Sequence, residues 1–211
     1  MEHIDLENWE RKALLQNYFG TDFPYIAMCA EVDVASFYRW TKARGLSFYH
    51  SLVFAANHTA NSIKNFRYRV DGEGKPYLIK ANRAIFTHMQ KDAELFCLVE
   101  VDAAESLAEF CRQAAEKAEA PIESNGWASI RNQADSIIYS AIPWVHFTMV
   151  TRTVTKGGYD CAPRITFGKY ERQGEKLMMP VAVQVHHGLM DGYHVGLYYQ
   201  RLQQALDRED W

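Results

Sequence analysis

The sequence predicts a domain of the α/β or α+β class, because it mixes two kinds of periodicity. Short β-branched or aromatic segments bounded by turn residues alternate with longer stretches whose apolar residues recur every three to four positions. The chain has 211 residues, 48% of them hydrophobic and 23% charged, which is enough to bury a core and excludes a disordered chain. Its 12 glycines and 6 prolines are scattered, so we expect no linker and one domain over residues 1–211.

Strands are expected where β-branched and aromatic residues are concentrated between turn signals. The segments are 26–34, 84–88, 95–101, 145–154, 165–170 and 181–187. Asp71-Gly72-Glu73-Gly74 predicts a hairpin turn between residues 67–70 and 77–79. Two further turns are expected at Lys156-Gly157-Gly158 and Gln173-Gly174-Glu175.

Helices are expected over residues 49–63, 103–120 and 194–207. The second is rich in Ala and Glu and is followed by Pro121, which cannot continue a helix. The third places Val195, Tyr198 and Leu202 on one face and polar residues on the other. Both are therefore expected to bury one side against the sheet.

Charge and cysteine content exclude several classes of function. Lys and Arg total 23 against 26 Asp and Glu, with no basic block, so nucleic acid and anionic membranes are not expected partners. No apolar run approaches the ~18 residues of a membrane span, and the N-terminus has no signal-peptide pattern, so we expect a soluble, cytoplasmic protein. The 4 cysteines lie far apart without a C-x-x-C pair and are expected to be reduced and partly buried.

The segment from Pro180 to His194 carries the most chemical information. Side chains alternate along a strand, so His187 continues the face of the valines at 181, 183 and 185, and His186 lies on the other. Ligands on opposite faces cannot share an ion, so no zinc site is expected. His187 ends the strand before a glycine-containing turn, which suits a general base. On composition alone, a buried histidine satisfied by hydrogen bonds is the alternative.

His186-His187-Gly188-Leu189-Met190-Asp191-Gly192 is an H-H-x-x-x-D-G motif and closely resembles that of the chloramphenicol acetyltransferase family. Peptide synthetase condensation domains share this motif, and dihydrolipoamide acyltransferase cores have an altered form of it. Further blocks in the family's order make the likeness more specific and extend it over nearly the whole chain. They are Asn8-Trp9-x-Arg11, Ser140-Ala141-x-Pro143-Trp144-Val145, and Ala162-Pro163-x-Ile165-Thr166-x-Gly168-Lys169-Tyr170.

The resemblance implies a two-layer sandwich, with helices packed on one face of a mixed β-sheet. It also implies a homotrimer with an active site at each subunit interface. Such enzymes transfer acetyl from acetyl-CoA to a hydroxyl, without a metal, and the family is associated with antibiotic resistance.

By position in the motifs, His187 is the implied general base, and Asp191 is a structural partner for Arg11. Ser140 is implied to donate to the oxyanion, with Thr166 supporting it through a water. The implied acceptor contacts are Tyr18, Trp144 and Arg152, and the implied CoA contacts are Lys169 and Tyr170.

These roles also make chemical sense without the family. A neutral imidazole can take the acceptor's proton as the thioester carbonyl is attacked, so no covalent enzyme intermediate is required. A fixed hydroxyl such as that of Ser140 lowers the barrier by roughly 2.7–4 kcal/mol if it acts like other oxyanion donors. Taken singly, Ser140 is an ordinary serine, Asp191 a turn residue and Arg11 a surface charge; their joint appearance favours the functional interpretation.

The sequence departs from the family pattern at three places. Ser47 stands where many members have a lysine toward CoA, and Arg152 stands where an apolar acceptor contact is expected. The turn residues Gly188-Leu189-Met190 replace the commoner Ala-Val-Cys. Acetyl transfer is still expected, whereas the acceptor, chloramphenicol or another small hydroxylated compound, is left open.

Two alternatives differ in class from this enzyme. A dihydrolipoamide acyltransferase is disfavoured, because 211 residues leave no room for a lipoyl domain and linker. A catalytically silent trimeric protein that binds a small molecule or acyl-CoA is the other. The joint presence of all five implied catalytic residues argues against it.

Overall fold

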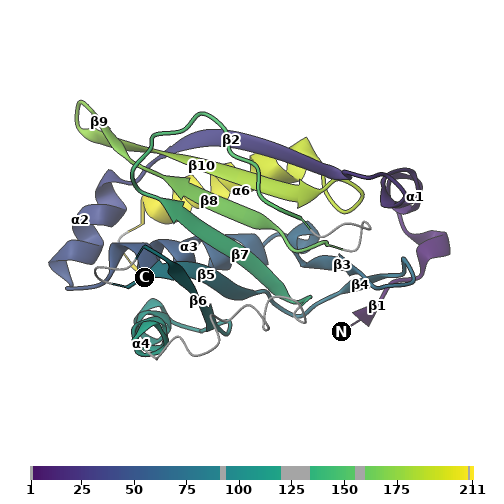
Figure 1. Cartoon of the computed structure of the whole chain (residues 1–211), viewed down its shortest axis with the longest axis horizontal. Coiled ribbons are helices and arrows are strands. Elements are labelled where there is room, and N and C mark those ends of the chain that lie inside the picture. The colour runs from purple at the N-terminus through teal and green to yellow at the C-terminus, as the bar shows by residue number, and fades with distance from the viewer. Residues whose placement is uncertain (1, 91–93, 120–133, 155–159, 209) are drawn as a thin grey trace.

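A mixed β-sheet forms one layer of the fold (Figure 1). The computed structural model describes residues 2–90, 94–119, 134–154, 160–208 and 210–211. The sheet order is β2 (Tyr25–Asp33), β10 (Lys176–His186), β8 (Arg164–Gly168), β7 (Ser136–Ile142), β5 (Arg83–Met89) and β6 (Phe96–Val101). β7 runs parallel to β5 and β8, and the other neighbouring pairs are antiparallel.

Shorter strands extend this framework. β9 (Glu171–Gln173) pairs with the start of β10 through a turn in which Gly174 has φ +64°, a conformation that favours glycine. β1 (Glu2–His3), β4 (Pro76–Leu78) and β3 (Tyr68–Val70) form a separate small sheet.

Helices form the second layer, behind the sheet in Figure 1. α3 (Phe48–Asn61) contacts α4 (Leu107–Ala118) and α6 (Gly192–Leu206), and these helices contact β5, β6 and β2 respectively. α2 (Ala35–Ala43) follows β2 and contacts α3 and β10. α1 (Lys12–Phe19) lies apart from this layer, near the end of β10, after the short 3-10 helix η1 (Leu6–Asn8). A second 3-10 helix, η2 (Lys64–Arg67), precedes β3.

Alternation along the strands gives the sheet two chemically different faces. The main apolar cluster, shared with the helices, takes one face, including Ile137 and Tyr139 of β7 and Ile165 and Phe167 of β8. The intervening residues, among them Ser140, Arg164 and Thr166, lie on the opposite face. Ser140 of β7 and Thr166 of β8, which the sequence motifs identified as candidate site residues, are therefore on the face away from the helices.

Most of the predicted elements are confirmed. The structure has the strands expected around 26–34, 84–88, 95–101, 165–170 and 181–187, the 67–79 hairpin and all three helices, with boundaries shifted by a few residues. The two-layer arrangement is also as expected. α1, α2, β1, β7 and β9 were not predicted. The turn expected at 156–158 lies outside the described residues.

The prediction of a strand over residues 145–154 is wrong. These residues belong to the connection from β7 to β8, which are parallel neighbours and need a crossover rather than a hairpin. β8 already has β7 and β10 on its two edges, so no edge is open to a further strand there. Instead, the side chain of Gln184 holds Arg152: its Oε1 accepts from the Arg152 N–H at 2.8 Å, and its Nε2 donates to the Arg152 carbonyl at 3.3 Å.

The cysteines are all unpaired thiols, three buried and Cys29 half-buried, as expected. None of the helices in the described ranges is long and apolar enough to span a bilayer.

Candidate active site

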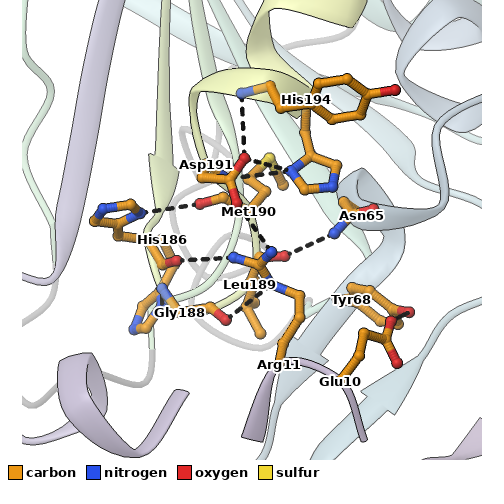
Figure 2. A network of polar contacts seen from close by, with 12 residues as sticks. Glu10, Arg11, Asn65, Tyr68, His186, Gly188, Leu189, Met190, Asp191 and His194 are labelled. Carbon is orange, nitrogen blue, oxygen red and sulfur yellow. Dashed lines mark hydrogen bonds and ion pairs between the residues drawn. The ribbon is translucent and has the colours of Figure 1, made fainter. Parts of the chain in front are cut away.

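The turn between β10 and α6 is held by Arg11, which is 6% exposed (Figure 2). Its Nη1 lies 3.1 Å from Asp191 Oδ2, and its Nε and Nη2 each donate at 3.3 Å, to the Gly188 and His187 carbonyls. Asn65 donates to the Leu189 carbonyl at 3.0 Å from the other side. The backbone around the H-H-x-x-x-D-G motif is thus fixed by side chains from distant parts of the sequence.

Asp191 begins α6 as its N-cap. Its Oδ1 accepts from the Tyr193 N–H at 3.1 Å, and the His194 side chain completes a capping box. Burial acts to raise the pKa of Asp191, but the hydrogen bond from Arg11 and the charges of His194 and Arg11 hold this pKa below its ordinary value. Asp191 therefore remains ionised at neutral pH.

His187 stands just past the end of β10, and its backbone N–H donates to the Pro24 carbonyl at 2.8 Å. Its Nδ1 lies 3.3 Å from the Met190 carbonyl oxygen, which can only accept. Nδ1 must then carry the proton of the neutral ring, which leaves Nε2 as the basic nitrogen. The Tyr18 ring stacks on the imidazole, with centroids 4.3 Å apart and 30° between the planes.

His186 has a different environment. It is 1% exposed, and its Nδ1 accepts from the Gly188 N–H at 3.1 Å. Its ring packs edge-on against Tyr25. Of the two adjacent histidines, His186 is the buried one and His187 is the half-buried one that keeps access to solvent.

A second group of candidate residues lies on the sheet face opposite the helices. Ser140 of β7 pairs in register with Thr166 of β8. Thr87 Oγ1 donates to Ser140 Oγ at 3.4 Å, which leaves the Ser140 proton to be donated elsewhere. Arg152 Nη1 donates to Thr166 Oγ1 at 3.3 Å.

The two groups lie far apart within one chain. Thr166, level with Ser140, pairs with Ala182 of β10, and His187 follows Ala182 by five residues. At about 3.3 Å per residue, this is roughly 16 Å along the strand. His187 is also absent from the described lining of the cavity that Ser140 opens into. The general base and the oxyanion donor implied by the sequence thus do not meet in a single copy.

Two neighbouring cavities lie in this region, and Ser140 lines the first of them. The first, about 530 Å³, is lined by residues that include Ser140, Trp144 and Arg152. The second, about 540 Å³, is lined by residues that include Trp144, Lys169 and Tyr170. Trp144 is 67% exposed and borders both. The acceptor and CoA contacts implied by the sequence, apart from Tyr18, therefore fall on two neighbouring hollows.

Gly168, Lys169 and Tyr170, which line the second cavity, are closely packed. A Cβ on Gly168 would come within 2.5 Å of Pro180 and 2.9 Å of Phe147, so only glycine allows this close approach. The Lys169 N–H donates to the Val145 carbonyl at 2.9 Å, and the Tyr170 ring packs against Tyr38. Ser47, which stands where many family members have a lysine, is the N-cap of α3 and accepts a hydrogen bond from the His50 N–H at 3.3 Å.

Comparison with known proteins decides the family. The family described as Chloramphenicol acetyltransferase matches residues 1–203. The chain belongs to the chloramphenicol acetyltransferase family. A chloramphenicol acetyltransferase of Clostridium perfringens is 29% identical over 99% of this chain and 96% of its own length, and one of Staphylococcus aureus is 28% identical over 99% and 97%.

Solved structures agree with this assignment. A chloramphenicol acetyltransferase superposes with a TM-score of 0.88 at 27% identity, covering 98% of this chain and 100% of its own. The cubic core of a pyruvate dehydrogenase complex superposes with a TM-score of 0.66 at 16% identity, covering 92% and 86%, and shows a shared fold alone.

Two residues of this family member were missed from its sequence. Thr87 orients Ser140, and Gln184 fixes the backbone of Arg152. Each is a polar residue in a largely apolar strand, and its polarity on the face away from the helices is the signal that distinguishes it. Across the described residues, no three His, Cys, Asp or Glu side chains group as metal ligands would.

Proposed function

We propose that this protein is an acetyl-CoA-dependent O-acetyltransferase that acetylates a hydroxyl of chloramphenicol or a related small hydroxylated compound. The observation that carries the proposal is the contact of His187 Nδ1 with the Met190 carbonyl oxygen, at 3.3 Å. This acceptor favours a proton on Nδ1, which leaves Nε2 of the half-buried ring free to act as a base. Membership of the family and the names of its relatives support the same reaction.

In this reaction, Nε2 of His187 takes the proton of the acceptor hydroxyl as the oxygen attacks the thioester carbonyl. The carbonyl oxygen becomes negatively charged, and the Ser140 hydroxyl, itself oriented by Thr87, donates to it. The tetrahedral intermediate then collapses, the carbon–sulfur bond breaks, and the imidazolium returns the proton to the CoA sulfur. The products are the acetyl ester and free CoA, and the enzyme is unchanged.

Arg11 and Asp191 act as positioning residues. Asp191 is ion-paired to Arg11. The Arg11 guanidinium also donates hydrogen bonds to the carbonyls of His187 and Gly188, and neither Arg11 nor Asp191 takes part in proton transfer. The pair keeps the His187 backbone in place. Tyr18 restricts the imidazole by stacking on one of its faces.

The active site is proposed to lie between subunits of a homotrimer. The separation of roughly 16 Å between the level of Ser140 and His187 along β10 supports this arrangement. His187 of one subunit then faces Ser140, Thr166 and the two cavities of the next. In a cyclic oligomer, one such contact repeated around the ring gives an equal site at every interface.

For the second cavity we propose binding of acetyl-CoA, with Lys169 toward phosphate and Tyr170 toward the adenine ring. With Ser47 at the N-cap of α3, the lysine that many family members have there is missing. The nucleotide contacts of this enzyme then depend more on Lys169. A cytoplasmic location is proposed with this function, since acetyl-CoA is supplied there.

The experiment is a thiol-release assay with acetyl-CoA, chloramphenicol and a panel of small hydroxylated compounds. Free CoA should form with at least one acceptor and should be lost in His187→Ala. Folded protein that releases no CoA with any acceptor would contradict the proposal and would favour a small-molecule or acyl-CoA binding protein.

A further inference from the structure

Arg152 is fixed at the cavity beside Ser140. Its backbone is held on both sides by Gln184, which is 2% exposed and lies on β10. Its guanidinium Nη1 donates to the buried Thr166 hydroxyl at 3.3 Å. These contacts hold the side chain in the lining of the cavity and keep it from extending into solvent.

The charge of Arg152 has no counter-ion among the described residues. The polar contact of its guanidinium is to a hydroxyl, and the salt bridges of the described chain do not include it. The nearby Arg164 is paired with Asp160. Burial lowers the pKa of Arg152, and the like charge of Arg164 lowers it further. A half-buried cation without an anion is unfavourable, so binding of an anionic group next to Arg152 would be stabilising.

The remainder of this cavity is mostly apolar. Besides Ser140 and Arg152, its lining includes the apolar side chains of Phe96, Leu98 and Ile138. It also includes Arg164, whose charge is paired with Asp160. Its volume, about 530 Å³, falls in the range of small-molecule sites. Apolar walls and a fixed guanidinium that, unlike that of Arg164, has no described counter-ion are the features of a site for an organic molecule that carries an anionic group.

We propose that the acceptor of this enzyme carries an acidic group, a carboxylate or an anion of similar shape, that pairs with Arg152 while its hydroxyl reacts beside Ser140. The inference rests on the proposed acetyl transfer and narrows its substrate class from small hydroxylated compounds to hydroxy acids. A planar guanidinium binds a carboxylate through two parallel hydrogen bonds, which a neutral amide cannot reproduce. The phosphates of CoA are assigned to the cavity lined by Lys169, so Arg152 remains for the acceptor.

Binding of benzoate and benzamide tests the proposal, because the two have nearly the same size and differ in charge. Calorimetry at constant ionic strength should give wild-type protein at least a ten-fold preference for benzoate, the size expected of a charge-assisted hydrogen-bonded pair. Arg152→Leu and Arg152→Gln should abolish the preference, and Arg152→Lys should keep part of it. Arg112→Leu, an exposed arginine on α4, is the control and should behave as wild type.

Turnover extends the test to 4-(hydroxymethyl)benzoate and 4-(hydroxymethyl)benzamide as acceptors. The ratio of their kcat/KM values should favour the acid in wild type and fall at least ten-fold in Arg152→Leu. Equal binding of benzoate and benzamide to wild type, or an unchanged preference in Arg152→Leu and Arg152→Gln, would overturn the proposal. So would an equal loss of kcat for both acceptors in Arg152→Leu with an unchanged ratio, since Arg152 would then serve the reacting carbonyl.

Failure of the anion site and failure of acetyl transfer give different results. If benzoate is preferred through Arg152 but no acceptor releases CoA, acetyl transfer is wrong while the anion site stands. If chloramphenicol is acetylated and benzoate shows no preference, the inference about the acceptor is wrong while acetyl transfer stands.

Discussion

Arg11 and Asp191 lie 180 residues apart in the sequence and form an ion pair with an Nη1–Oδ2 distance of 3.1 Å. Arg11 also donates to the carbonyls of Gly188 and His187, whereas Asp191 has its other contacts with α6. Within the described hydrogen bonds and ion pairs, none joins Asp191 to the His187 ring. The carboxylate thus acts on the histidine through the backbone of the turn.

Asp191→Asn should test the pair without removing the helix cap, since asparagine is also a good N-cap. Asp191→Asn and Arg11→Ala should each lower both the melting temperature and the turnover rate. The loss in stability for Arg11→Ala should be about 1–3 kcal/mol, because it removes the charged hydrogen-bond donor of a half-buried Asp191 and of two backbone carbonyls. The double mutant should lose much less than the sum of the two. Additive losses, or an unchanged melting temperature in Asp191→Asn, would exclude the ion pair as the positioning element.

His187→Ala should reduce turnover by at least ~10²–10⁴, the range for loss of a general base, and leave the fold intact. His186→Ala should mainly lower stability, because it removes a buried ring and leaves the Gly188 N–H without its acceptor. Steady-state rates and melting curves of the two variants separate these effects. The reverse pattern would mean that the two histidines have been assigned the wrong roles.

Ser140→Ala should lower kcat by ~10² and leave KM for both substrates within a few-fold, because the oxyanion forms only as the thioester is attacked and is absent from the bound substrates. Thr87→Val should lower kcat by a smaller factor, since Thr87 acts through Ser140. Thr87→Ser, which restores the donor, should recover the rate. A rise in KM alone for Ser140→Ala would make Ser140 a binding residue.

The pKa of His50 is lowered from 6.5 to about 4 by burial and then by the nearby His88. Between these two pH values His50 is protonated in the unfolded chain and neutral in the folded one. The free energy of unfolding should therefore fall as the pH drops from 6.5 to about 4. His50→Gln should reduce this slope, whereas His58→Gln, at an exposed position of the same helix, should not. Denaturant unfolding at several pH values measures it; identical slopes in the wild type and His50→Gln would contradict the assignment.

The sequence predicted the elements whose local signals are strong. The Ala- and Glu-rich composition before Pro121 predicted α4, and the apolar face of Val195, Tyr198 and Leu202 predicted α6. Both helices also have a side-chain N-cap. α1 and α2 were missed because Arg11 and Val34 precede them and neither makes a side-chain cap. Their starts depend on tertiary contacts, which are not visible in a window of sequence.

The error at residues 145–154 has a related cause. Valine and threonine favour strands, but a strand also needs an open edge, and strand order is a property of the whole sheet. The site shows the same limit. Motifs identified His187, Ser140 and Arg11 individually, whereas the distance between His187 and Ser140 depends on the register of three strands, which motif spacing does not encode.

The most direct test of the account is complementation between His187→Ala and Ser140→Ala. Each variant alone should be nearly inactive. If His187 and Ser140 of one site come from different subunits, co-expressed or co-refolded mixtures should form sites with both residues intact. For random cyclic trimers at equal amounts, about one site in four should be intact, which predicts roughly a quarter of the wild-type rate. A mixture no more active than the mean of its two parents would contradict a site shared between subunits.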